Sequence, residues 1–104
     1  MIAHKDFESD CKRIAKEIMK IVSDPSNDQF DDAICSGRLE VYISLPLVKE
    51  VNKERYKYKK KWEKEINKHL NGCSITLNGV GTGRGWFISF NIEFDDVDAE
   101  TEDW

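Results

Sequence analysis

The sequence has no apolar run that approaches the ~20 residues needed by a membrane-spanning helix. Residues 1–6 also lack the apolar core of a secretory signal peptide. Only three cysteines are present, Cys11, Cys35 and Cys73, and their odd number and unpaired spacing argue against a disulfide framework. These absences predict a soluble protein of a reducing compartment. We expect it in the cytoplasm of a cell or of a host cell, with no membrane partner.

Residues that carry out catalysis or bind metals are scarce. His4 and His69 are the only histidines, and the pair His69 and Cys73 is too small a ligand set for zinc. No segment has the ligand spacing and sixth-position glycine of a calcium loop. The sequence shows no pair of carboxylates whose surroundings would move their pKa values apart, as a general acid and a general base require. We therefore expect no enzyme activity, no cofactor and no metal site.

Glycine is concentrated in residues 79–85, between two predicted strands. Backbone N–H groups of such a stretch can bind anions, but dinucleotide- and triphosphate-binding loops lead directly into a helix. We interpret the stretch as a flexible hairpin loop, and the alternative is a loop that grips a ligand or partner through Arg84. Residues 84–86 also begin like an RNA-recognition signature. The match then fails, because the alternate residues from Trp86 to Phe94 are apolar and face the core.

The length of 104 residues suits one domain with one core. Apolar residues at three- and four-residue steps predict a helix over residues 6–23. Ser26 and Gln29 have the spacing of a capping box, which predicts a short second helix over residues 27–35.

A third, long helix is predicted to begin at Ser44 and Pro46 and to continue to residue 70. A helix of ~24 residues spans about 36 Å, whereas a strand of ~8 residues spans about 27 Å. The helix should therefore project beyond the sheet, and its apolar stripe continues through Trp62 and Ile66. Because exposed apolar stripes usually mark interfaces, we expect self-association as a two-fold homodimer through this helix.

Strict alternation of apolar and polar residues predicts half-buried strands over residues 38–45, 73–78 and 86–94. The helix between the first two strands makes them parallel neighbours, and the last two form an antiparallel hairpin. The predicted fold class is α+β: a three-stranded mixed sheet in α-α-β-α-β-β order, with helices on one face. We expect one domain over residues 1–94 and a disordered acidic tail over residues 95–104.

Charge is unevenly distributed along the chain. Residues 49–68 carry nine Lys or Arg against four Glu, whereas residues 93–104 carry seven Asp or Glu and no base. A basic stretch with interleaved aromatics is typical of nucleic-acid contact. A solvated helix face, or a contact with an acidic protein surface that includes this chain's own acidic end, would give the same pattern. The candidate nucleic-acid-binding residues are Arg55, Tyr56, Lys57, Lys59, Lys60, Lys61 and Lys64.

The sheet face predicted to meet water provides the preferred site. It carries two aromatic residues, and aromatic pairs can anchor a partner, while spaced carboxylates in the tail can mimic phosphates. The candidate partner-binding residues are Tyr42, Phe87, Arg84, Asp95, Asp96, Asp98 and Glu100. We predict a non-enzymatic interaction protein that binds, and inhibits or modulates, a larger macromolecule, as viral or phage accessory and anti-defence proteins do. The alternative is a nucleic-acid-binding module that uses residues 49–68.

Overall fold

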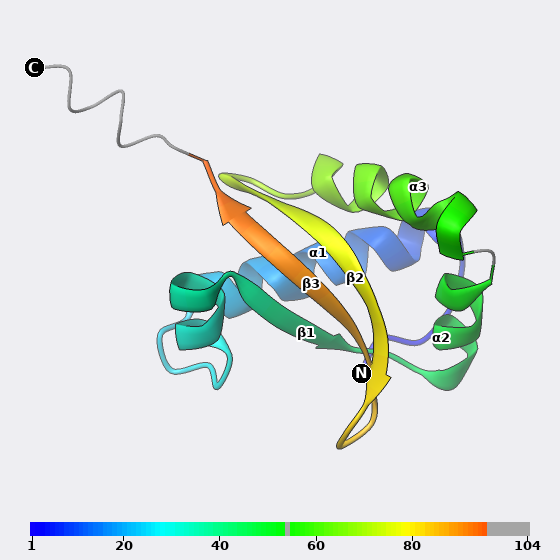
Figure 1. The fold of residues 1–104 in the computed structure, drawn as a ribbon, viewed down its shortest axis with the longest axis horizontal. Coiled ribbons are helices and arrows are strands. Elements are labelled where there is room, and N and C mark those ends of the chain that lie inside the picture. The colour runs from blue at the N-terminus through cyan, green and yellow to red at the C-terminus, as the bar shows by residue number, and fades with distance from the viewer. Residues whose placement is uncertain (54, 96–104) are drawn as a thin grey trace, which may run out of the picture.

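The computed structural model describes residues 1–53 and 55–95, and for residues 55–58 it describes the backbone only. Figure 1 shows helices packed behind one face of a three-stranded sheet. In chain order the elements are α1 (Phe7–Ser23), η1 (Asp32–Ser36), β1 (Arg38–Tyr42), α2 (Leu45–Asn52), α3 (Arg55–Lys68), β2 (Cys73–Thr82) and β3 (Trp86–Phe94). The α+β class predicted from the sequence is confirmed. No helix in the described ranges has the length and apolar character needed to cross a membrane.

The sheet has the order β1-β3-β2, and both strand pairs are antiparallel. The prediction of a mixed sheet with β1 beside β2 is therefore wrong. β1 and β2 do run in the same direction, but β3 lies between them (Figure 1). A central strand pairs its backbone groups on both edges. β3 reaches this position because the short turn after β2 keeps it next to β2 while its other edge pairs with β1.

The core lies between the inner face of the sheet and the helices. α1 contributes a buried stripe that includes Ile14 and Ile18, and β3 contributes Phe90 from the centre of the sheet. The strand faces are those that the alternation predicts, except at the strand ends. Trp86 and Phe94, predicted to face the core, are 39% and 43% exposed, and Leu45, predicted to end the first strand, is exposed at the start of α2. The buried strand residues are Leu39, Val41, Cys73, Ile75, Leu77, Ile88, Phe90 and Ile92.

The predicted long helix is in fact two helices. It begins as expected, since the hydroxyl of Ser44 accepts a 3.4 Å hydrogen bond from the N–H of Leu47. It is interrupted at Lys53, whose backbone is extended with φ −65° and ψ 116°. A helix cannot continue through that conformation, so α2 ends at Asn52 and α3 starts at Arg55.

The interruption removes the projection beyond the sheet. α3 has 14 residues and β2 has 10, which correspond to about 21 Å and about 33 Å. Trp62 and Ile66 are 3% and 0% exposed, so they are buried within a single chain. The apolar stripe that motivated the homodimer prediction is therefore buried at these two residues. Self-association stays a prediction, but an exposed stripe at Trp62 and Ile66 no longer supports it.

A short helical element is present between α1 and β1 as predicted, but it begins later than residue 27 and is the π-helical turn η1, with Gly37 as its C-cap. Turns precede it, and the capping box is absent. Instead, the side chain of Gln29 donates a 2.8 Å bond to the carbonyl of Glu40 and accepts a 2.6 Å bond from its N–H. Two bonds to a strand edge replace the bond that a capping box would have made.

The glycine-rich stretch is partly strand rather than entirely loop. β2 extends to Thr82, past an irregularity between Leu77 and Gly79, and Gly81 lies opposite Phe87. A Cβ atom at Gly81 would lie 2.8 Å from the Phe87 ring. Glycine therefore allows the ring to lie directly against the neighbouring strand.

Candidate functional site

Two aromatic residues meet on the outer face of the sheet, away from the helices. Tyr42 in β1 lies directly opposite Phe87 in β3, and their ring centroids are 6.0 Å apart at an interplanar angle of 74°. This is the edge-to-face geometry that aromatic pairs favour. Both side chains are half-buried, so the pair presents a rigid apolar surface that solvent still reaches.

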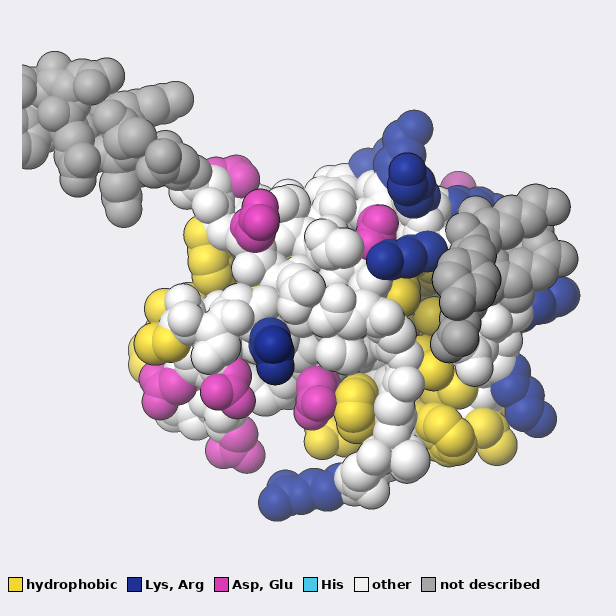
Figure 2. Space-filling model, in the orientation of Figure 1, with side chains coloured by type: hydrophobic (Ala, Val, Ile, Leu, Met, Phe, Trp, Pro, Cys, Tyr) yellow, Lys and Arg dark blue, Asp and Glu magenta, His cyan; other side chains and the backbone are white. Residues whose placement is uncertain are grey.

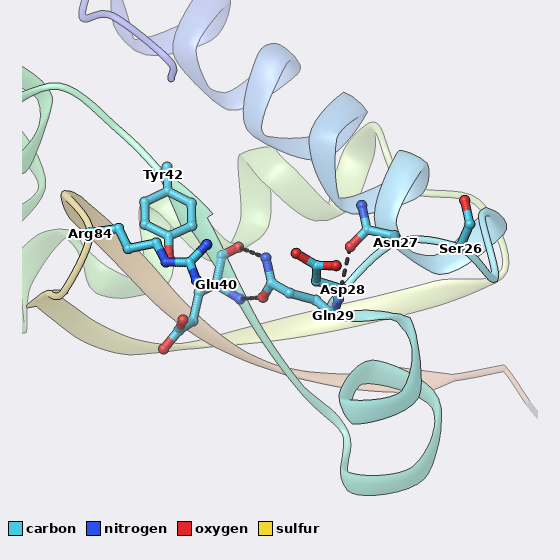
Figure 3. Close-up of a pocket in the computed structure, with 7 residues that line it drawn as sticks. All are labelled: Ser26, Asn27, Asp28, Gln29, Glu40, Tyr42 and Arg84. Atoms are coloured by element: carbon cyan, nitrogen blue, oxygen red, sulfur yellow. Dashed lines mark hydrogen bonds between the residues drawn. The ribbon is translucent and has the colours of Figure 1, made fainter.

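Tyr42 also lines an open pocket of about 690 Å³, drawn in Figure 3. Arg84, from the β2–β3 turn, lies beside the Tyr42 ring, and the segment after α1 forms the opposite side of the pocket. The lining residues are Ser26, Asn27, Asp28, Gln29, Glu40, Tyr42 and Arg84. Tyr42 therefore joins the aromatic pair to a polar pocket that contains one guanidinium and two carboxylates.

Hydrogen bonds hold the segment after α1 in place. Bonds from the hydroxyl and the N–H of Ser26, at 2.7 and 3.0 Å, lower the pKa of Asp24 below its ordinary value. The side chain of Asn27 accepts a 2.9 Å bond from the N–H of Gln29, which in turn bonds to Glu40 of β1. One wall of the pocket is thus tied to the sheet.

The structure brings together three of the seven predicted partner-binding residues: Tyr42, Phe87 and Arg84. Asp95 is exposed, and its N–H donates a 2.9 Å bond to the carbonyl of Gly72 at the start of β2. It lies beyond the opposite end of β3 from Phe87, about 26 Å away at ~3.3 Å per residue. Asp96, Asp98 and Glu100, with most of the predicted disordered tail, lie outside the described residues.

The predicted basic surface lies on α3, and Figure 2 shows Lys and Arg side chains gathered over that part of the molecule. Lys60 and Lys64 are exposed, whereas Lys59 lines a second pocket. The ammonium of Lys61 lies 4.6 Å from the centroid of the Phe7 ring. The predicted members whose side chains lie outside the described part are Arg55, Tyr56 and Lys57.

A buried ionic cluster was not anticipated from the sequence. The Asp10 carboxylate is 0% exposed and lies 2.7 Å from Nδ1 of His4. It also accepts bonds of 2.9 Å from the N–H of Lys5 and 2.6 Å from the Arg13 guanidinium. The position of Asp10, three residues after Phe7 on the apolar stripe of α1, is the sequence signal for its burial.

The ionic cluster attaches the N-terminal segment to the sheet. The Arg13 guanidinium donates a 2.6 Å bond to the carbonyl of Ala3, and the N–H of His4 donates a 3.3 Å bond to the Ser44 hydroxyl. Ile2 pairs with Ile43 just beyond β1. Every polar group of Asp10 has a protein partner, so the cluster stabilises the fold rather than offering an open site.

Two of the three thiols are buried, and Cys35 is exposed. Burial raises the pKa of the Cys11 thiol to about 12 and also raises the pKa of Cys73. The imidazole of His69 lies 3.3 Å from the Glu65 carboxylate, whose pKa is lowered mainly by a hydrogen bond from Lys68. Within residues 1–53 and 55–95, no group of three or more His, Cys, Asp or Glu side chains could hold a metal ion.

The geometry on the outer face suits binding. Aromatic and arginine side chains are the residue types that contribute most to protein interfaces, and here they surround an open polar pocket. Comparisons with family models, with curated proteins and with solved structures found no match to this chain.

Proposed function

We propose that this chain is a small, non-enzymatic interaction protein that binds a protein partner through Tyr42, Phe87 and Arg84, and thereby inhibits or modulates that partner. The observation that carries the proposal is the shared position of Tyr42. It packs edge-to-face on Phe87 and lines the same pocket as Arg84. One surface with an apolar part and a charged part thus joins Tyr42 of β1 to Arg84 and Phe87 of the β2–β3 hairpin, as in binding hot spots.

The charges of the pocket indicate which chemistry the partner presents. Arg84 is suited to a carboxylate of the partner, because a guanidinium donates in a planar fork that matches it. Asp28 and Glu40 are suited to a basic side chain. We therefore propose a partner segment that carries both signs of charge beside an apolar residue, which contacts the Tyr42–Phe87 pair.

The proposal is tested by photo-crosslinking and pull-down with the full chain in its native cytoplasm, after nuclease treatment. The protein captured by the unmodified chain should be retained about tenfold less by Tyr42→Ala and by Arg84→Glu. Thr76→Ala is the matched control, since Thr76 is exposed on the same sheet face at a distance from the pocket. Equal capture by all three variants, each shown to be folded by circular dichroism, would contradict the proposal.

A second candidate function is nucleic-acid binding by α3, and the exposed side chains of Lys60 and Lys64 favour it. The net charge of −4 opposes it. We expect weak, sequence-independent binding of labelled DNA or RNA in fluorescence anisotropy, with an affinity that falls steeply as salt rises. The Lys60→Glu/Lys64→Glu variant should abolish this binding. Tight, sequence-selective binding at physiological salt would instead make nucleic acid the main ligand.

A further inference from the structure

Side chains and the N-terminal segment form hydrogen bonds to much of the backbone at the two edges of the sheet. On β1, the Gln29 carboxamide pairs with both backbone groups of Glu40, as a neighbouring strand would. Ile2 pairs with the carbonyl of Tyr42 and the N–H of Ser44. Natural sheets block their edges in such ways because an open edge pairs with other chains. Along the outer edge of β1, Glu40 and Tyr42 thus both have hydrogen-bonded backbone groups, so no two successive outward-facing residues are unpaired.

The first half of the β2 edge is closed in the same manner by α3, which lies beside it in Figure 1. The Asn67 carboxamide accepts a 2.8 Å bond from the N–H of Ile75 and donates a 3.2 Å bond to its carbonyl. The Glu63 carboxylate accepts a 2.6 Å bond from the N–H of Leu77. These bonds stop at Leu77, where the register of β2 shifts.

Beyond the register shift, the edge of β2 is open. Trp86 and Ile92 direct their backbone groups toward the β1 side of β3, through bonds to Ile43 and Gly37. Ile88 lies an even number of residues from both, so its backbone groups also face β1. Val80 lies opposite Ile88 and Thr82 opposite Trp86, so in an antiparallel ladder both direct their N–H and C=O groups outward. No described residue bonds to these outward groups.

An apolar pocket of about 280 Å³ adjoins the open edge. Figure 2 shows hydrophobic side chains gathered along the outer side of β2 and over α2. The pocket is lined by Val51, Asn52, Lys59, Trp62, Leu77, Asn78, Gly79 and Val80. It therefore combines apolar side chains and one cationic side chain with the unpaired backbone of Val80, and Thr82 lies two residues further along the same edge.

We propose that the open part of β2, at Val80 and Thr82, binds an extended acidic peptide segment of a partner protein as a fourth strand. The peptide backbone pairs with Val80 and Thr82, and one apolar side chain enters the pocket beside Trp62. Acidic residues of the peptide lie near Lys59, which lines the pocket. The segment that contains Lys59, residues 49–68, carries nine Lys or Arg against four Glu. Strand addition of this kind takes affinity from the main chain and specificity from alternate side chains.

This edge lies on the opposite side of the sheet from β1, and its backbone groups point away from β3 and β1. The probe is a synthetic peptide with a central leucine, glutamates two positions to either side and serines elsewhere. It is titrated into the 15N-labelled full chain. We expect amide shifts centred on Val80 and Thr82, and slowed hydrogen exchange at both. A peptide N-methylated at the amides facing β2 should bind about tenfold more weakly. Equal binding of the methylated peptide, shifts centred on Tyr42, or no binding at millimolar concentration would overturn the proposal.

Two substitutions at one exposed position isolate the backbone contribution. Proline is tolerated on edge strands where the N–H faces outward, so Thr82→Pro removes one outward donor while Thr82→Ala keeps it. We expect the proline variant to bind the peptide about tenfold more weakly and the alanine variant to bind within about twofold of the unmodified chain. If removal of residues 96–104 strengthened peptide binding about tenfold, the chain's own acidic end would be the occupant, and the partner proposal would be overturned.

Discussion

At the scale of single residues, Asp10 connects the N-terminal segment to α1. Its buried carboxylate has three partners, from His4, Lys5 and Arg13. Asp10→Ala leaves the N–H of Lys5 without an acceptor and removes one acceptor of the Arg13 guanidinium, which keeps its bond to the Ala3 carbonyl. We expect the free energy of unfolding to fall by about 1–3 kcal/mol in urea denaturation, as when the acceptor of a buried hydrogen bond is removed. Glu8→Ala, on the exposed side of the same helix, should change it by less than about 0.5 kcal/mol. Equal midpoints for the two variants would refute a stabilising role.

The three cysteines should differ in reactivity. Cys35 is exposed, whereas Cys11 and Cys73 are buried and have raised pKa values. Because the thiolate is the reactive form, a disulfide-exchange reagent at pH 8 should modify Cys35 alone in the folded chain. All three thiols should react in denaturant. Rapid modification of a second thiol without denaturant would show that the core around α1 or β2 opens readily.

Cys11 also makes stability depend on alkaline pH. Its thiol ionises near 9.0 in the unfolded chain, but burial raises the pKa to about 12 in the folded chain. The contribution of this thiol to stability is therefore complete below pH 9 and is lost as pH rises toward 12. Cys11→Ala should be less stable at neutral pH, yet its free energy of unfolding should fall less steeply between pH 9 and pH 11. Parallel slopes in urea denaturation would show that Cys11 is not the titrating group.

At the scale of elements, Gln29 is expected to protect the β1 edge. Gln29→Leu removes two bonds and leaves both backbone groups of Glu40 unpaired, which should cost about 1–2 kcal/mol and promote association at the edge. Urea denaturation and light scattering measure the two effects. Asn91→Leu is the control, because it also adds an exposed apolar side chain. It breaks only the side-chain bonds to Asn78 and leaves the backbone paired. Equal association of both variants would show that surface hydrophobicity, not edge exposure, is responsible.

The predicted elements succeeded where local periodicity determines structure and failed where distant contacts do. α1 and the buried faces of all three strands follow from the spacing of apolar residues. The break at Lys53 has no local signal such as glycine or proline, so the pattern over residues 45–70 was interpreted as one helix. The role of Gln29 was missed for the same reason, because its partner Glu40 is eleven residues away.

At the scale of the whole molecule, the acidic C-terminal end should not be needed for folding. Residues 96–104 have no periodic apolar pattern and are dense in like charge. Truncation after Asp95 retains the bond from its N–H to Gly72. The melting temperature should change by less than about 3 °C, as measured by circular dichroism. A decrease of many degrees on truncation that persists at high salt would show that this end packs on the rest of the chain through apolar contacts.

The sequence by itself determined the α+β class, the inward faces of the strands and the stripe of α1. These follow from residue spacing, which a helix or strand converts directly into a buried face. Only the tertiary structure decided that β3 lies between β1 and β2, that Asp10 is buried with His4 and Arg13, and that Tyr42 meets both Phe87 and Arg84. The strand order and the contacts of Tyr42 join residues far apart in the chain, and the contacts of Asp10 join the N-terminal segment to α1. They depend on which packing buries the apolar faces while leaving the fewest backbone and charged groups unpaired.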